Sequence, residues 1–85
     1  MKEAVIESIH RNLREQGVTA SLGNETKFED MDIDSLGLYS MVAGVEDDHD
    51  VTVNCGEFAG LEGVSDLADV IVAKHEAARQ IPKAA

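Results

Sequence analysis

Residues 28–42 read Phe28-Glu-Asp-Met-Asp-Ile-Asp-Ser35-Leu-Gly-Leu-Tyr-Ser-Met-Val42. An acidic loop ends in this stretch, and apolar residues then recur at helical spacing from Leu36 onward. Ser35 lies where one pattern gives way to the other. Its side-chain oxygen can accept hydrogen bonds from the free N–H groups of a first helical turn. The stretch therefore predicts a loop that leads into a helix, with Ser35 as the candidate cap.

The rest of the chain predicts an all-α fold. Helices are expected over residues 3–16, over residues 36–48 and from residue 64 or 65, with Ser65 as cap, to about residue 79. Glycines confine a shorter helical turn to residues 57–61. We expect a small bundle of three main helices plus one short helix, with a long first loop over residues 18–34. Residues 1–80 should form a single domain, and residues 81–85 a flexible tail.

Apolar spacing predicts which helix faces are buried. In the first helix the buried positions are Val5, Ile6, Ile9 and Leu13. In the second helix they are Leu38, Met41, Val42 and Val45, and His49 extends this face. In the last helix they include Leu67, Val70 and Ile71. The opposite side of the second helix should hold Gly37, Ser40, Gly44, Asp47 and Asp48. A chain of 85 residues buries only roughly 60% of its unfolded surface, so this core is thin.

Charge and cysteine content limit the function. The net charge is −10, and residues 28–73 contain twelve Asp or Glu but neither Lys nor Arg. Such a surface disfavours nucleic acid and anionic membranes, and it favours partners with basic surfaces. Cys55 is the only cysteine, so no disulfide can form within the chain, and we expect a monomer in a reducing cytoplasm. Neither a signal peptide nor a membrane-spanning segment is apparent.

Three segments resemble the acyl carrier protein family over nearly the whole chain. They are Phe28 followed by Asp32-Ile-Asp-Ser-Leu36, the helix that ends Val45-Glu-Asp-Asp-His-Asp-Val-Thr-Val53, and Val64-Ser-Asp-Leu-Ala-Asp-Val-Ile71. The resemblance implies that a phosphopantetheinyl transferase attaches 4′-phosphopantetheine to Ser35. The thiol of that arm would carry acyl groups as thioesters, and the chain itself would not be an enzyme. A helix N-terminus also suits an attached phosphate on physical grounds.

The resemblance further implies a docking surface for acyl-transfer or synthase enzymes. Its expected members are Asp34, Leu36, Tyr39, Ser40, Glu46 and Asp47. A cleft lined by Leu38, Met41, Val42, Val45, Leu61 and Val70 could shelter an acyl chain. Family members that serve fatty-acid synthesis usually have acidic residues two and five positions after the serine, where this chain has Gly37 and Ser40. This departure favours a specialised lipid or secondary-metabolite pathway.

Several alternatives deserve comparison with the carrier hypothesis. A noncatalytic acidic adaptor of the same fold, or an aminoacyl or peptidyl carrier, would have a similar sequence. An EF-hand starting at Asp30 would need Gly and Glu where Ser35 and Met41 stand, so no metal site is expected. A hydrolase pairing Ser35 with His49 is excluded because fourteen helical residues separate them by about 21 Å.

Overall fold

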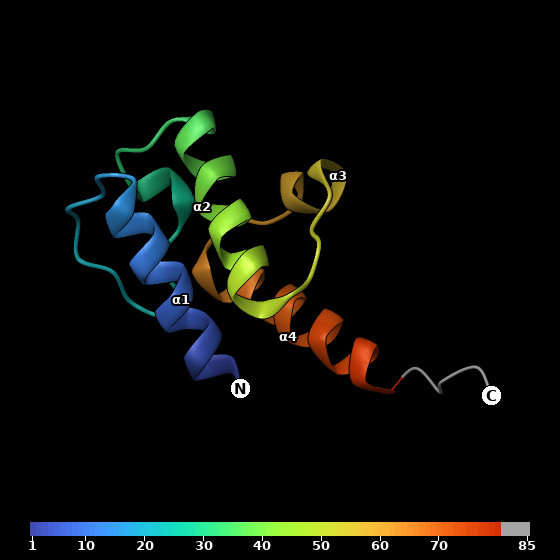
Figure 1. Ribbon diagram of the computed structural model, residues 1–85. Coiled ribbons are helices and arrows are strands. Elements are labelled where there is room, and N and C mark those ends of the chain that lie inside the picture. The colour runs from blue at the N-terminus through green and yellow to red at the C-terminus, as the bar shows by residue number, and fades with distance from the viewer. Residues whose placement is uncertain (81–85) are drawn as a thin grey trace.

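The computed structural model of the chain describes residues 1–80, which fold into four α-helices and one 3₁₀ turn (Figure 1). The elements are α1 (Lys2–Glu15), η1 (Phe28–Asp30), α2 (Ser35–His49), α3 (Cys55–Ala59) and α4 (Val64–Gln80). The predicted all-α class, with three main helices and a short one, is confirmed. Helix α3 begins two residues earlier than predicted. The tail expected at residues 81–85 lies outside the described residues.

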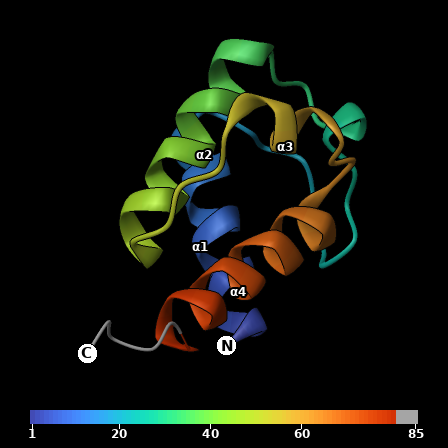
Figure 2. The same ribbon diagram turned by 90° about the vertical axis from the view of Figure 1, so that its right-hand side faces the viewer.

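Helix α1 packs against both α2 and α4, and the three helices enclose the core (Figures 1 and 2). All four predicted apolar positions of α1 are buried. The other helices contribute Met41, Val42 and Val45 from α2, Phe58 from α3, and Val64, Leu67, Ala68 and Ile71 from α4. Each fully buried Val, Leu, Ile or Met contributes roughly 1.5–3 kcal/mol through the hydrophobic effect. The core is therefore mainly aliphatic, with Phe28 and Phe58 as its aromatic members.

Gly44 lies against Asn12 of α1, and not on the outer side of α2 where the apolar pattern placed it. A methyl group at this position would overlap the side-chain amide of Asn12. Asn12 is 7% exposed and belongs to the buried face of α1. The two helices can approach this closely only because residue 44 has no side chain.

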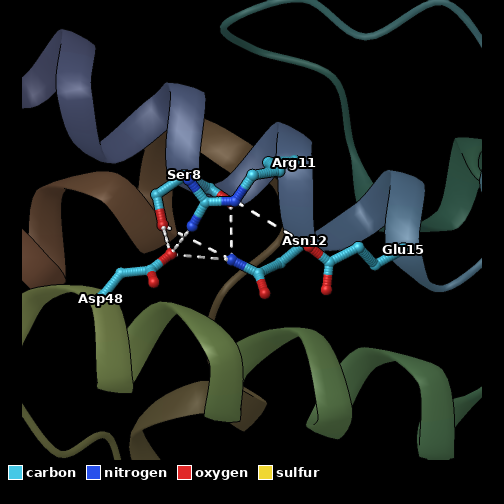
Figure 3. A network of polar contacts seen from close by, with 5 residues as sticks. All are labelled: Ser8, Arg11, Asn12, Glu15 and Asp48. Carbon is cyan, nitrogen blue, oxygen red and sulfur yellow. Dashed lines mark hydrogen bonds and ion pairs between the residues drawn. The ribbon is translucent and has the colours of Figure 1, made fainter.

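Asp48 also faces α1, one helical turn beyond Gly44, and corrects the prediction that it points outward (Figure 3). Its Oδ2 accepts a hydrogen bond of 2.6 Å from Ser8 Oγ and one of 3.2 Å from Asn12 Nδ2. The guanidinium of Arg11 forms an ion pair with the same oxygen. Ser8 and Asn12 are polar groups on a buried helix face, and such groups are costly unless they are hydrogen-bonded. The carboxylate of Asp48 supplies an acceptor for both.

The long loop after α1 is held to its neighbours by polar contacts. Arg14 Nη1 donates to the carbonyls of Val18 at 3.0 Å and Ala20 at 2.9 Å. Further along, the backbone N–H of Phe28 donates to Glu62 O at 2.8 Å. Together with a second bond from Val64 N, this contact fastens the end of the loop to the start of α4.

Helix α3 starts earlier than predicted, whereas α4 begins at Val64, one of the two residues predicted for its start, but without the predicted cap. Asn54 and Glu57 form a reciprocal capping box that opens α3, which the surrounding glycines obscured in the sequence. Cys55 is the exposed first residue of this helix. Ser65 does not cap α4 but is its second residue. Asp66 instead accepts a 2.9 Å bond from the backbone N–H of Glu62.

Replacing Asp48 tests the polar contact between α1 and α2. We expect Asp48→Ala to lower the free energy of unfolding by about 1–3 kcal/mol, because it leaves Ser8 and Asn12 without their charged acceptor. The exposed neighbour Asp47 provides the control, since Asp47→Ala should change stability by less than about 0.5 kcal/mol. Urea denaturation at neutral pH measures both. An equal decrease in the free energy of unfolding in the two variants would contradict the role given to Asp48.

The stabilities of the native chain and of Asp48→Ala, measured at different pH values, give a second test. The hydrogen bond from Ser8, assisted by Asn12 and Arg11, lowers the pKa of Asp48 below its ordinary value of 3.8. A carboxyl whose pKa is lower in the folded state stabilises the fold above the ordinary value, and this stabilisation is lost as the pH falls through the folded value. The difference in stability between the native chain and Asp48→Ala should therefore shrink under acid conditions.

Candidate functional site

Ser35 is the exposed first residue of α2, and Asp34 before it is the N-cap. The Asp34 side chain accepts a 2.8 Å hydrogen bond from the backbone N–H of Gly37. The prediction that Ser35 caps this helix is therefore wrong by one residue. Asp is as good a cap as Ser, and the chain enters the helix one residue earlier than the apolar pattern indicated. As a result, the Ser35 hydroxyl is not required for capping.

Ile33 and Gly37 shape the first turn of α2. Ile33 precedes the cap and Leu38 is the fourth helical residue, the two positions that form a hydrophobic staple, and both are partly buried against the core. The Ile33 side chain occupies the space above Gly37. A Cβ at residue 37 would lie 2.8 Å from Ile33 Cγ1. The first turn thus has no room for an acidic side chain at this position unless Ile33 moves.

The other residues expected to bind partners lie along α2 in different environments. Leu36 is 75% exposed and Tyr39 is 48% exposed, and Ser40 and Asp47 are also on the surface. The Glu46 carboxylate, in contrast, accepts a 2.6 Å bond from the backbone N–H of Val53. Glu46 therefore helps to hold the segment that follows α2.

Tyr39 connects α2 to α3 through aromatic contacts. Its ring centroid lies 5.8 Å from that of Phe58, which lies 5.5 Å from that of Phe28. These spacings are those of attractive tilted aromatic pairs. Beside them, Glu57 of α3 forms a 2.9 Å ion pair with Lys74 of α4. Phe58 is the buried anchor of α3, and Tyr39 covers it on the side of α2.

The cleft expected for an acyl chain is occupied by the core itself. Met41 and Val45 are fully buried and Val42 is 5% exposed, whereas Leu38, Leu61 and Val70 are only partly buried around them. Leu61 also lines a shallow surface pocket of about 240 Å³ together with Phe28, Glu29 and Glu62. An acyl chain placed among the six expected residues would have to displace packed side chains.

The acidic residues before Ser35 do not assemble into a metal site. Over residues 1–80, no three His, Cys, Asp or Glu side chains are grouped so that they could hold an ion. Within the same residues, no helix combines the length and apolar character needed to cross a membrane.

A family model described as the phosphopantetheine attachment site matches residues 3–71. This match runs from α1 into α4 and covers most of the chain. The chain belongs to the phosphopantetheine attachment site family. It is a noncatalytic carrier domain whose 4′-phosphopantetheine is attached covalently to a serine. Membership implies a phosphopantetheinyl transferase and acyl-transfer enzymes as partners. Comparisons with curated proteins and with solved structures gave no significant match.

Substitutions of Asp34 separate its role as a cap from its charge. Asp34→Ala should lower the free energy of unfolding by about 1 kcal/mol, because the N–H of Gly37 loses its acceptor. Asp34→Asn keeps a cap oxygen and should retain most of the stability. Urea denaturation of both variants measures the difference. Equal destabilisation would show that the charge of Asp34, and not its hydrogen bond, stabilises the helix.

Proposed function

We propose that Ser35 is the serine that carries the phosphopantetheine arm. The observation that supports this most directly is its exposed position at the start of α2 beside a separate cap, Asp34. Backbone N–H groups and the helix dipole at such a position stabilise an attached phosphate. Two other serines have structural contacts: Ser8 is buried against Asp48, and Ser65 accepts a 3.2 Å bond from Lys2.

For the bond-forming step itself, this chain supplies the hydroxyl of Ser35. The Ser35 oxygen would form a bond to the phosphorus of coenzyme A that bears the pantetheine arm, while the bond to the adenosine bisphosphate breaks and the serine proton is released. Once attached, the arm supplies a thiol that holds an acyl group as a thioester. The chain's own contribution is to present Ser35 on a fixed helix and to provide a surface for the enzymes that act on the cargo.

The docking surface is proposed to lie along α2 and its cap, with the residues expected from the resemblance: Asp34, Leu36, Tyr39, Ser40, Glu46 and Asp47. The net charge of −10 would speed encounters with basic-surfaced enzymes through electrostatic steering. Two of these residues, Asp34 and Glu46, also make hydrogen bonds within the chain. Their contribution to docking would therefore be combined with a structural one.

The pathway is proposed to be a specialised lipid or secondary-metabolite pathway, with an acyl cargo in preference to an aminoacyl or peptidyl one. Uncharged Gly37 and Ser40 support this, because they remove charge from the part of α2 nearest to Ser35. Ile33 adds a structural reason, since it fills the space that a side chain at residue 37 would need.

Intact mass after incubation with coenzyme A and a broad-range phosphopantetheinyl transferase tests the attachment site. The native chain should gain the mass of one phosphopantetheine, and Ser35→Ala should gain none because it lacks the accepting oxygen. Ser21→Ala, which removes an exposed hydroxyl from the loop after α1, is the control and should be modified like the native chain. A full mass gain in Ser35→Ala would place the arm on another serine.

The pathway proposal has its own test. The modified chain should be elongated poorly by a standard fatty-acid synthase in vitro, since the first turn of α2 after its cap Asp34 has no acidic side chain for basic partner surfaces. Product chains released per carrier would be compared with those from a carrier that serves fatty-acid synthesis. Efficient elongation on this chain would contradict a specialised role.

A further inference from the structure

All the aromatic residues of the chain lie together, beside the first half of α2. The sequence contains one Tyr, two Phe and no Trp. The ring centroid of Phe58 lies 5.8 Å from that of Tyr39 and 5.5 Å from that of Phe28. These three residues form an aromatic cluster that joins α2, α3 and η1. Tyr39 follows Ser35 by one helical turn, so the cluster lies close to the proposed attachment point.

Phe58 fills the space between α3 and α2. It is 8% exposed and is the buried residue of α3. Phe28 is also 8% exposed, whereas Tyr39 is 48% exposed and is the outer member of the cluster. The interior next to this end of α2 is therefore filled by an aromatic ring, and the ring is covered on the outside by a second one.

Polar contacts hold α3 in the position that places Phe58 there. Glu57, the residue before it, forms a 2.9 Å ion pair with Lys74 of α4. The segment that leads into α3 is held by the 2.6 Å hydrogen bond from Val53 N to the carboxylate of Glu46. A movement of α3 that withdrew Phe58 from the interior would have to break these contacts as well as the ring contacts.

The area of the Phe58 side chain sets the size of a cargo that could replace it. A buried Phe removes roughly 150–250 Å² from water. A buried methylene group removes about 30 Å². An acyl chain would therefore have to bury about five to eight methylene groups to recover the area that Phe58 loses. The lost contacts between rings raise this requirement further.

The hollow beside the aromatic cluster does not offer an alternative site for an apolar chain. This pocket of about 240 Å³ is lined by Phe28, Leu61, Glu29 and Glu62. Two of its four lining residues are carboxylates, and covering a charged group with apolar atoms is unfavourable. An acyl group near Ser35 thus meets either a filled interior or a pocket with charged walls.

We propose that Phe58, held between Tyr39 and Phe28, keeps the acyl group out of the interior, and that the cargo is a short acyl group of roughly eight carbons or fewer. A long apolar chain left outside would be unfavourable in proportion to the area that it exposes to water. A short acyl group exposes little, and its thioester stays in solvent, where enzymes can reach it. This inference rests on the proposed function, because it assumes that the arm is attached to Ser35.

Acyl groups of two lengths test the proposal. A broad-range phosphopantetheinyl transferase loads the protein from coenzyme A, from butyryl-coenzyme A or from octanoyl-coenzyme A, and intact mass shows that loading is complete. Urea denaturation of each product then gives the midpoint of unfolding. A group that is sheltered only in the folded state raises this midpoint, whereas a group that stays in solvent leaves it unchanged.

Three variants accompany the native chain. Phe58→Ala empties the space of the ring, and Phe58→Leu empties part of it at a smaller cost in stability. Ile6→Ala is the control, because it removes a buried side chain from the first half of α1, beside Asn24 and Ser65. It creates space in the core away from α3.

We expect the midpoint of the native chain to be the same within about 0.2 M urea for all three loaded forms. The eight-carbon group should raise the midpoint of Phe58→Ala by about 1 M, because it occupies the emptied space. Phe58→Leu should show a smaller rise in the same direction. Ile6→Ala should resemble the native chain in its response to cargo.

A rise in the midpoint of the native chain with the eight-carbon group would overturn the proposal, because the cargo would then enter past Phe58. So would a failure of this group to stabilise the Phe58 variants, or an equal stabilisation of Ile6→Ala. If Phe58→Ala does not fold, the native chain and Phe58→Leu still decide. Absence of a mass gain in the native chain with coenzyme A alone would instead overturn the proposed function.

Discussion

The packing of α2 against α1 determines which residues of α2 face the core and which face the surface. Gly44 lets the two helices approach closely, and Asp48 receives the polar groups that α1 buries at the same interface. These contacts fix the rotation of α2 about its own axis. Once that rotation is fixed, Met41 and Val45 must enter the core and Leu36, Tyr39 and Ala43 must face outward. Ser35 is then presented at the exposed end of a helix that is held along its length.

A carrier needs an accessible attachment point and a surface that several enzymes can use in turn. The attachment point and the docking surface that we propose would be different parts of one helix, α2. Asp34 performs the capping, so the adjacent serine does not have to. Glu46 and Asp48 stabilise the C-terminal half of α2 through hydrogen bonds to the following segment and to α1. The acidic residues of α2, which the sequence suggests for recognition by partners, thus also stabilise the fold. The exposed apolar residues Leu36, Tyr39 and Ala43 remain available for contact.

Helix α3 is held to the rest of the fold by fewer buried side chains than the other helices. It has five residues and one buried side chain, Phe58, which lies against Tyr39 and Phe28. Its ends are held by the bond from Val53 N to Glu46 and by the backbone contacts between Phe28 and Glu62. Because the interior is filled by packed side chains, a cargo chain could enter only by separating elements. The ion pair between Glu57 and Lys74 also attaches α3 to α4.

Local signals in the sequence located the three main helices and most of their buried apolar residues, because helical spacing is a local property. Leu38 and Val70 are exceptions, since both are only partly buried. The sequence also contains the signal for the cap of α2. Because Asp and Ser are equally good caps, the local pattern does not show whether Asp34 or Ser35 is the cap. The partners of Gly44 and Asp48 were decided only by the tertiary structure. Both were predicted to face outward, because helical spacing identifies an apolar face and cannot show that Asn12 and Ser8, 32 and 40 residues away, need space and an acceptor on α2.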